Sequence, residues 1–320
     1  MNQGTISVVI PVLNEADKLE RCLEAVYDQS YPPCQVIVVD GLSTDDTVER
    51  AHRFPVQVFY EGARSIARAR QVGVDNAVGE YVAFTDADCV PERGWLAALV
   101  AGFGDGIVGV GGAARNVGDG LWDQSINLAM NTFLGGARTA QARVIAERRL
   151  VKSIGGFNSI CRRRDIASVG GFDVRLPGGE DLDLSKRLSR RGGLLYTPDA
   201  VVVHRHSWTV SKFARKMFRY GKERGMVRAW DLQVVPPLLV PLALLSLLLT
   251  RWALTALVAL YCALVAAVTV QVAAREGDAR YLLTLPVACV IEHVMYSTGF
   301  WIGLARPPRG GDEKAPRRRT

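Results

Sequence analysis

Short apolar runs alternate with amphipathic segments over the first 90 residues of the chain. The apolar runs are rich in β-branched residues, which is typical of strands covered on both faces of a sheet. The segments between them, such as residues 14–29 and 63–77, place apolar residues at helical spacing. Strands and helices that alternate at this spacing predict βαβ units in an α/β domain with a parallel sheet. The four predicted strands are ISVVIPV (6–12), VIVVD (36–40), VQVFY (56–60) and EYVAF (80–84).

Toward its C-terminal end the chain becomes almost wholly apolar. A first apolar stretch covers 234–274, interrupted by Arg251, and a second covers 281–304, with Glu292 and His293 inside it. A helix that crosses a membrane needs about 20 apolar residues, so the second stretch fits one span and the first divides into two. Buried helices of a soluble protein are the alternative, but such helices rarely lack a polar face over this length.

We therefore expect a membrane domain of two or three helices over residues 233–305, followed by a basic, disordered tail over 306–320. Positively charged segments tend to remain on the cytoplasmic side, so this tail favours an even number of crossings below a cytoplasmic N-terminal domain. The proline-containing segment 234–250 would then re-enter the membrane or lie in its interface. These expectations describe a multi-pass protein of the inner or plasma membrane.

Positive charge is concentrated in three places, and the net charge is +7. Basic residues crowd the segments 138–164, 212–228 and 306–319, which indicates an anionic partner such as a phosphate group or a membrane surface. No RNA- or DNA-binding motif is recognisable, so we expect no nucleic-acid partner. The six cysteines show neither a CxxC pair nor a metal-binding spacing, and they indicate ordinary thiols in a reducing compartment.

Residues 209–232 are predicted to form a basic amphipathic helix between an N-terminal α/β domain, residues 1–208, and the membrane domain. Phe213, Met217 and Tyr220 share one face of this helix, while lysines and arginines supply its charge. A basic amphipathic helix beside membrane spans lies in the headgroup region, where it is attracted to anionic membrane lipids.

Two carboxylates, Asp86 and Asp88, follow the strand predicted at 80–84. In an extended segment residues i and i+2 point the same way, so both side chains can converge on one point. Two carboxylates so near each other require a cation between them. Mg²⁺ or Mn²⁺ takes oxygen ligands and shares them with substrate phosphates. Ligands of parallel sheets gather at the carboxyl ends of the strands, which adds residues 11–15 and 40–45 to the same crevice. Solvated loop carboxylates are the structural alternative.

Four segments, in order along the chain, together resemble the family 2 glycosyltransferases. The resemblance runs from about residue 5 to about residue 230, and it implies the GT-A fold, a Rossmann-like domain with a mixed, mostly parallel sheet. The chain departs from the family's usual residues at Gly41, Leu42 and Gln71. The four segments are VVIPVLNEADKLERCL, VIVVDGLSTDDT, ARARQVGVDNAVGEYVAFTDAD and SVGGFDVRLPGGEDLDLSKRL.

The resemblance implies a nucleotide-sugar donor in the crevice at the strand ends. Arg70 would lie near the donor's diphosphate or the carboxylates beside it, and Asp86 and Asp88 would bind nucleotide and metal. The residues that would hold the nucleoside are Pro11, Asn14, Glu15 and Asp40.

Each of these donor-side residues also has a structural alternative. Asn14 and Glu15 could cap the helix that follows them. Asp40 could be a turn residue, and Arg70 could pair with Asp75 on its own helix.

On the acceptor side, the resemblance implies that Asp181, in the pair Glu180-Asp181, is the catalytic base of an inverting transfer. It would deprotonate the incoming hydroxyl while the metal neutralises the departing diphosphate. Some GT-A enzymes add a histidine to the metal shell, and of His204 and His206 the better candidate is His204. The same resemblance implies that Phe157 and Asn158 line the acceptor pocket. Alternatively, the acidic pair is favoured by a helix dipole, and the histidine is only hydrogen-bonded near a strand end.

The segment KMFRY, residues 216–220, is faintly similar to the family's QxxRW signature, with Lys216 and Tyr220 in place of the usual residues. Arg219 could then contact the donor's diphosphate, and a purely electrostatic lipid anchor is the alternative. The signature accompanies polymer-making members of the family, so the replacement of two of its residues here favours the addition of a single sugar.

These patterns predict a membrane-anchored, metal-dependent glycosyltransferase that moves a sugar to a polyprenyl-linked or polysaccharide acceptor. A sugar-phosphate nucleotidyltransferase is disfavoured, because such enzymes open with a glycine-rich loop where this chain has PVLNEADK. A catalytically silent binding scaffold would be expected to lose Asp86, Asp88 or Asp181, and all three are present.

Overall fold

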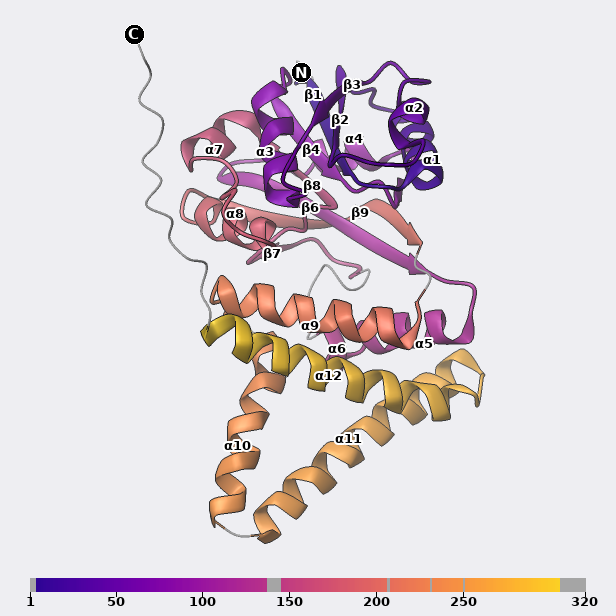
Figure 1. Ribbon diagram of the computed structural model, residues 1–320, viewed down its shortest axis with the longest axis vertical. Helices are drawn as coiled ribbons and strands as arrows, with labels where there is room; N and C mark the ends of the chain where they lie inside the picture. The colour runs from indigo at the N-terminus through magenta and orange to yellow at the C-terminus, as the bar shows by residue number, and fades with distance from the viewer. Residues whose placement is uncertain (1–3, 137–144, 206–207, 231, 250, 306–320) are drawn as a thin grey trace.

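A sheet domain rests on a layer of long helices, from which a helical hairpin projects (Figure 1). In this computed structural model the described residues are 4–136, 145–205, 208–230, 232–249 and 251–305. The tail over 306–320, expected to be disordered, lies outside the described residues.

Four parallel strands form one half of the sheet, in the order β3-β2-β1-β4, and they are the four strands that the sequence predicts. Every residue of β1 is buried, as expected for a strand covered on both faces. Beyond β4 the sheet is mixed, with β8 antiparallel to β4 and the long strands β6 and β9 parallel to each other. The strands are β1 (Ile6–Val12), β2 (Gln35–Asp40), β3 (Gln57–Tyr60), β4 (Tyr81–Thr85), β5 (Cys89–Pro91), β6 (Ile107–Val117), β7 (Arg149–Val151), β8 (Asn158–Arg162) and β9 (Gly193–Arg205).

Helices cover both faces of the parallel half. Because strand residues alternate between the faces, Val8 and Ile10 of β1 pack in the cluster that includes the apolar stripe of α1, whereas Val9 packs with α3. Short helices connect the remaining strands. The helices of the sheet domain are α1 (Ala16–Tyr27), α2 (Thr47–Ala51), α3 (Ile66–Asn76), α4 (Trp95–Val100), α7 (Arg163–Ser168) and α8 (Glu180–Leu188).

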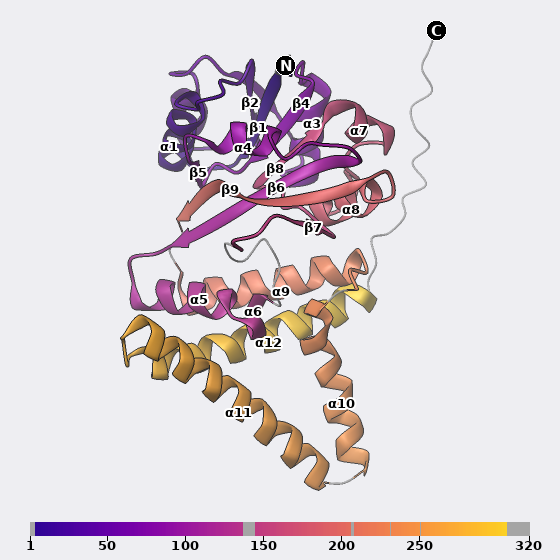
Figure 2. The same ribbon diagram turned by 180° about the vertical axis from the view of Figure 1, so that it is seen from behind.

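A layer of helices lies beneath the sheet domain, and α9 and α12 run side by side in it (Figures 1 and 2). Their backbones are in contact at glycines. A Cβ at Gly221 or Gly225 would overlap the backbone of α12, and one at Gly299 or Gly303 would overlap that of α9. The helices of this layer are α5 (Leu121–Asn131), α6 (Phe133–Gly136), α9 (Val210–Met226) and α12 (Tyr281–Ala305).

The hairpin consists of α10 (Val235–Leu249) and α11 (Arg251–Glu276), preceded by the short 3₁₀ helix η1 (Leu232–Val234). It points away from the sheet domain (Figure 1). Among the described residues, two helical segments are long and apolar enough to cross a membrane, Trp252–Glu276 and Tyr281–Ala305. With 15 residues, α10 is shorter than the roughly 20 residues that a span requires.

Candidate active site

Side-chain hydrogen bonds tie together the loops that follow β1 and β2. Asn14 has a positive φ of 54°, and its Oδ1 accepts a hydrogen bond from the Thr44 amide at 2.7 Å. The buried Asp40 accepts hydrogen bonds from the Ser43 amide, at 2.9 Å, and from the Ser43 hydroxyl. Asp40 therefore does serve as a turn residue, whatever else it binds. Pro11 is buried within β1.

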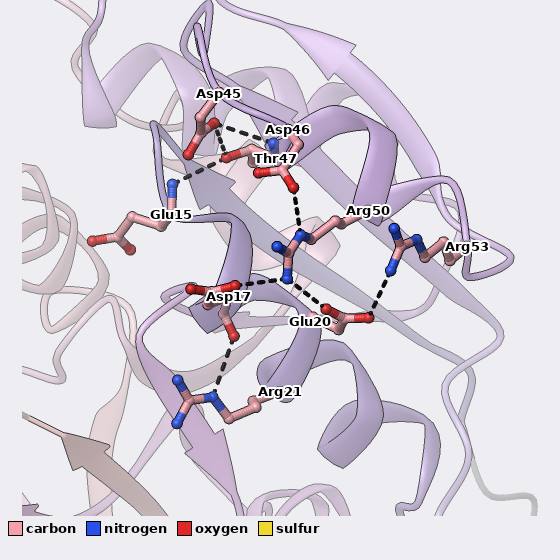
Figure 3. A network of polar contacts seen from close by, with 9 residues as sticks. All are labelled: Glu15, Asp17, Glu20, Arg21, Asp45, Asp46, Thr47, Arg50 and Arg53. Carbon is pink, nitrogen blue, oxygen red and sulfur yellow. Dashed lines mark hydrogen bonds and ion pairs between the residues drawn. The ribbon is translucent and has the colours of Figure 1, made fainter.

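Glu15 stands at the start of α1, but its side chain forms no capping hydrogen bond, so the capping alternative is wrong for it. Its amide donates to Thr47 Oγ1 at 3.0 Å, and its carboxylate points away from the ion-pair network that joins α1 to α2 (Figure 3). At the centre of that network Arg50 contacts Asp17, Glu20 and Asp46. Burial raises the pKa of Glu15, against the hydrogen bond from Lys18 at 2.9 Å.

Arg70 connects the two acidic motifs of the sequence. From α3, its buried guanidinium donates to Asp86 Oδ1 at 2.8 Å and also pairs with Glu180 at the start of α8. Burial opposes the positive charge, but the neighbouring carboxylates outweigh it and raise the pKa of Arg70. The alternative pairing with Asp75 is wrong, because Asp75 accepts a hydrogen bond from Gln71 at 2.7 Å.

Asp181 lies in the first turn of α8, next to Glu180. Its Oδ2 accepts a hydrogen bond from the Gly156 amide at 3.1 Å, and its Oδ1 accepts one from Leu182 at 2.7 Å. The Glu180 side chain is only 5% exposed and is paired with Arg70, whereas Asp181 is partly exposed. Of the two acids, Asp181 is therefore the one within reach of a ligand. Both also occupy the helix end where the dipole favours acidic residues.

Asp88 and His204 meet at the edge of the sheet, where β5 pairs with β9. His204 Nε2 lies 2.9 Å from Asp88 Oδ2. Burial of Asp88 opposes its ionisation, but the hydrogen bond with His204 and the positive charges nearby outweigh it and lower its pKa to about 2. A carboxylate that stays ionised beside an imidazole nitrogen is a suitable pair of ligands for a divalent metal ion.

Cys89 completes a cluster with Asp88 and His204 in which the potential ligand atoms lie within 4.8 Å of one another. Burial and the neighbouring carboxylates raise the pKa of the Cys89 thiol, and thiols are in any case poor ligands for Mg²⁺ or Mn²⁺. Asp86 is not part of this cluster, because its carboxylate is hydrogen-bonded to Arg70. The two aspartates therefore have different protein partners, one a cation and the other a histidine.

A cavity of about 420 Å³ adjoins this edge of the sheet. Its lining comes from α1, from the strand ends beside Asp88 and from the first turns of α9. The lining residues are Lys18, Arg21, Asp88, Val90, Val117, Gly118, Asp119, Arg205, Trp208, Lys212 and Lys216.

Two residues that the resemblance assigns to ligands, Asn158 and Arg219, have partners within the protein. Asn158 is buried in the sheet, and its side chain bonds Trp95 Nε1 at 2.7 Å and two backbone carbonyls, so it does not line an acceptor pocket. The ring of Phe157 lies 5.9 Å from that of His204. Arg219 is exposed and lies 3.7 Å from Glu223, while Lys216, one turn earlier, lines the cavity.

Sequence reasoning missed Lys18, Arg21 and Glu223. A helical projection would have placed Lys18 and Arg21 on the polar side of α1, but nothing in it indicates a cavity. The carboxylate of Glu223 packs against Gly178, where a Cβ would overlap it, just before the acidic pair of α8. The sequence signal that could have identified Glu223 is its position as a lone acidic residue in an otherwise basic helix.

The parallel strands with acidic residues at the end of β4 and at the start of α8 define a GT-A domain. A mannosyltransferase from Pyrobaculum calidifontis, PcManGT, solved in complex with GDP-Man and Mn²⁺, matches the fold with a TM-score of 0.60. The two chains are 23% identical, and the match covers 92% of this chain and 88% of that one.

The chain belongs to glycosyltransferase family 2, whose model matches residues 7–169. Glycosyltransferase AglE from Haloferax volcanii is 30% identical over 247 residues, which is 71% of this chain and 74% of AglE. The dolichyl N-acetyl-alpha-D-glucosaminyl phosphate 3-beta-D-2,3-diacetamido-2,3-dideoxy-beta-D-glucuronosyltransferase of Methanococcus voltae is 24% identical over 318 residues, covering 94% of this chain and 97% of that enzyme. The protein is therefore a glycosyltransferase, which excludes the nucleotidyltransferase alternative.

Proposed function

We propose that this glycosyltransferase moves a sugar, with inversion, from a nucleotide-sugar donor to a polyprenyl-linked or polysaccharide acceptor. The observation that carries the proposal is the position of Arg70, which contacts both Asp86 on the donor side and Glu180 beside Asp181. A relative named for a dolichyl phosphate substrate supports a lipid-linked acceptor.

Asp88 and His204 would hold a divalent ion, Mg²⁺ or Mn²⁺, which would offset the negative charge of a departing diphosphate. The support is their 2.9 Å approach at the sheet edge and the PcManGT complex, which contains both GDP-Man and Mn²⁺. Asp86 keeps Arg70 beside the diphosphate. Glu15, Asn14 and the Asp40 turn would border the nucleoside, and Pro11 would support them from within β1.

Asp181 acts as the general base. Its carboxylate takes the proton of the acceptor hydroxyl as that oxygen forms a bond to the anomeric carbon, and the bond from that carbon to the diphosphate breaks on the opposite side. Glu180 is a positioning residue, because its ion pair with the buried Arg70 fixes the first turn of α8. Arg219, at the exposed surface of α9, would reach the diphosphate only by leaving Glu223.

We further propose that the α10–α11 hairpin, with the apolar α12 lying along the membrane surface, anchors the enzyme to the cytoplasmic face of a membrane, and that α9 contacts anionic lipids there. The lysines and arginines of α9 and the apolar length of α11 and α12 support this arrangement. No nucleic-acid partner is part of the proposal.

The direct test compares Asp181→Asn with the wild-type enzyme in membranes supplied with Mn²⁺ and a panel of nucleotide sugars. We expect transfer, measured as release of nucleoside diphosphate, to fall at least about 100-fold, the lower range of a general base's contribution. Asp183→Asn is the matched control, because it removes a carboxylate of the same helix that pairs with Arg187. Equal turnover by the Asp181→Asn variant and the wild type would remove Asp181 as the base. A wild type without transfer on any donor would favour the silent scaffold.

A further inference from the structure

The cavity beside Asp88 is strongly basic. Five cations line it against two carboxylates, Asp88 and Asp119, so positive charge prevails even before a metal ion is counted. The cations come from two separate helices and the end of β9, which together surround the space. They are Lys18, Arg21, Arg205, Lys212 and Lys216.

Several of these cations have no carboxylate partner in the part of the chain that the structure describes. Among the described residues, no carboxylate forms an ion pair with Arg205, Lys212 or Arg21, whose Nε donates to the carbonyl of Asp17 at 3.2 Å. The Lys216 ammonium lies 4.8 Å from the centre of the Trp208 ring. Grouped cations around a concave surface attract an anion, and lysine and arginine are the residues that bind phosphate groups.

The cavity is separate from the residues assigned to the donor. Its lining shares only Asp88 with them and includes neither Asp40 nor Arg70. A ligand in this space would therefore lie next to the candidate metal ligand Asp88 without occupying the positions assigned to the nucleoside.

One wall of the cavity belongs to the helix layer that adjoins the hairpin. Trp208 donates from Nε1 to Asn127 of α5 at 3.2 Å, and Ser125 of the same helix bonds Thr284 of α12 at 2.6 Å. A lipid head group that extends from a membrane beside α12 would contact this wall first. A soluble nucleotide could bind without approaching from the membrane side.

We propose that this cavity holds the phosphate or diphosphate head group of a polyprenyl-linked acceptor. The inference rests on the proposed function and specifies its acceptor: a lipid whose charged head lies between α1 and α9 while its hydrocarbon chain leaves along the helix layer. Arg21 and Lys212 bind the head group from opposite walls.

The test is a binding measurement, so it does not depend on sugar transfer. Full-length protein in detergent is titrated with undecaprenyl phosphate, undecaprenyl diphosphate and phosphatidylglycerol, and bound lipid is quantified by native mass spectrometry. UDP and GDP with Mn²⁺ are titrated in parallel. The test variant is Arg21→Gln with Lys212→Gln. The control is Arg93→Gln with Arg190→Gln, which removes the same charge from exposed positions that do not line the cavity.

We expect the test variant to bind undecaprenyl phosphate or diphosphate about tenfold more weakly than the control does, a loss typical of charge-assisted contacts. Its binding of phosphatidylglycerol should change less. Three outcomes would overturn the proposal. An equal loss of affinity for UDP or GDP would make the cavity the donor's diphosphate site, and an equal loss of affinity for phosphatidylglycerol would make it a general lipid contact. The third outcome is no loss of affinity for any of the ligands. Absent sugar transfer by the wild type would instead contradict the proposed function.

Discussion

A single guanidinium, that of Arg70, brings together acids that are far apart in the sequence. Asp86 lies at the end of β4 and Glu180 at the start of α8, and both contact Arg70. Spacing alone suggested a local partner, Asp75, because only neighbours one turn away are visible in a helical pattern. The motif was readable from the chain, whereas the long-range ion pair required the fold.

Glu223 is a second residue whose surroundings matter more than its local sequence. It lies on α9 near two cations of the same helix, Lys216 and Arg219, yet it packs against Gly178 close to Glu180 and Asp181. Burial and the two acids of α8 outweigh the cations and raise the pKa of Glu223 to about 7. The folded protein therefore keeps a proton on Glu223 that the unfolded chain, with a value near 4.5, releases.

This raised pKa predicts a pH-dependent stability. The contribution of protonated Glu223 is fully present below pH 4.5 and is lost as the pH rises through about 7. Between pH 5 and 8 the melting temperature of the wild type should fall by about 5 °C more than that of Glu223→Gln, whose amide cannot ionise. Thermal melts of the detergent-solubilised protein measure this. Glu49→Gln, at an exposed position, is the control, and parallel curves for wild type and Glu223→Gln would contradict the prediction.

At the scale of elements, the parallel half of the sheet was predictable and the mixed half was not. The runs in β1, β2 and β4 are continuously apolar because both faces are buried. The long pair β6 and β9 contains glycine, polar residues and register shifts, and its strands join across more than 70 intervening residues. Neither periodicity nor spacing identifies such a partner.

The contact between α9 and α12 depends on glycine. Alanine at position 225 or 299 would place a Cβ into a backbone carbonyl of the opposite helix. Because alanine is otherwise the better helix former by about 1 kcal/mol, any loss of stability is due to the contact.

We expect Gly225→Ala and Gly299→Ala each to lower the stability of the solubilised protein by about 1–3 kcal/mol, the usual cost of overpacking. Thermal melts provide the measurement. Gly62→Ala is the matched control, since a Cβ there meets nothing within 4 Å. If the helix variants melt no lower than Gly62→Ala, the two helices are not in backbone contact.

At the scale of the whole molecule, α12 belongs with the helix layer rather than with the hairpin. It is apolar enough to span a membrane, but several of its polar residues bond to the layer, besides the contacts that His293 and Trp301 make with the hairpin. His293 contacts the Leu134 carbonyl at 3.0 Å, Thr284 bonds Ser125, and Tyr281 donates to Gln124 at 2.9 Å. Hydropathy alone cannot distinguish a spanning helix from one that lies along a neighbour, because both are long and apolar.

We predict that both ends of α12 lie on the same side of the membrane as the sheet domain, and that the α10–α11 hairpin alone enters the bilayer. A hairpin that enters and returns gives an even number of crossings, whether it spans or re-enters, and keeps a basic tail beside the catalytic domain. Single cysteines at Arg280→Cys and Thr320→Cys, in a cysteine-free background, can be labelled with a membrane-impermeant maleimide in intact and permeabilised cells. Asp28→Cys, exposed on the sheet domain, is the same-side reference. Both test cysteines should be labelled from the same side as the reference. If Thr320→Cys is labelled from the opposite side, α12 spans the membrane, and its polar contacts with the helix layer must then be broken.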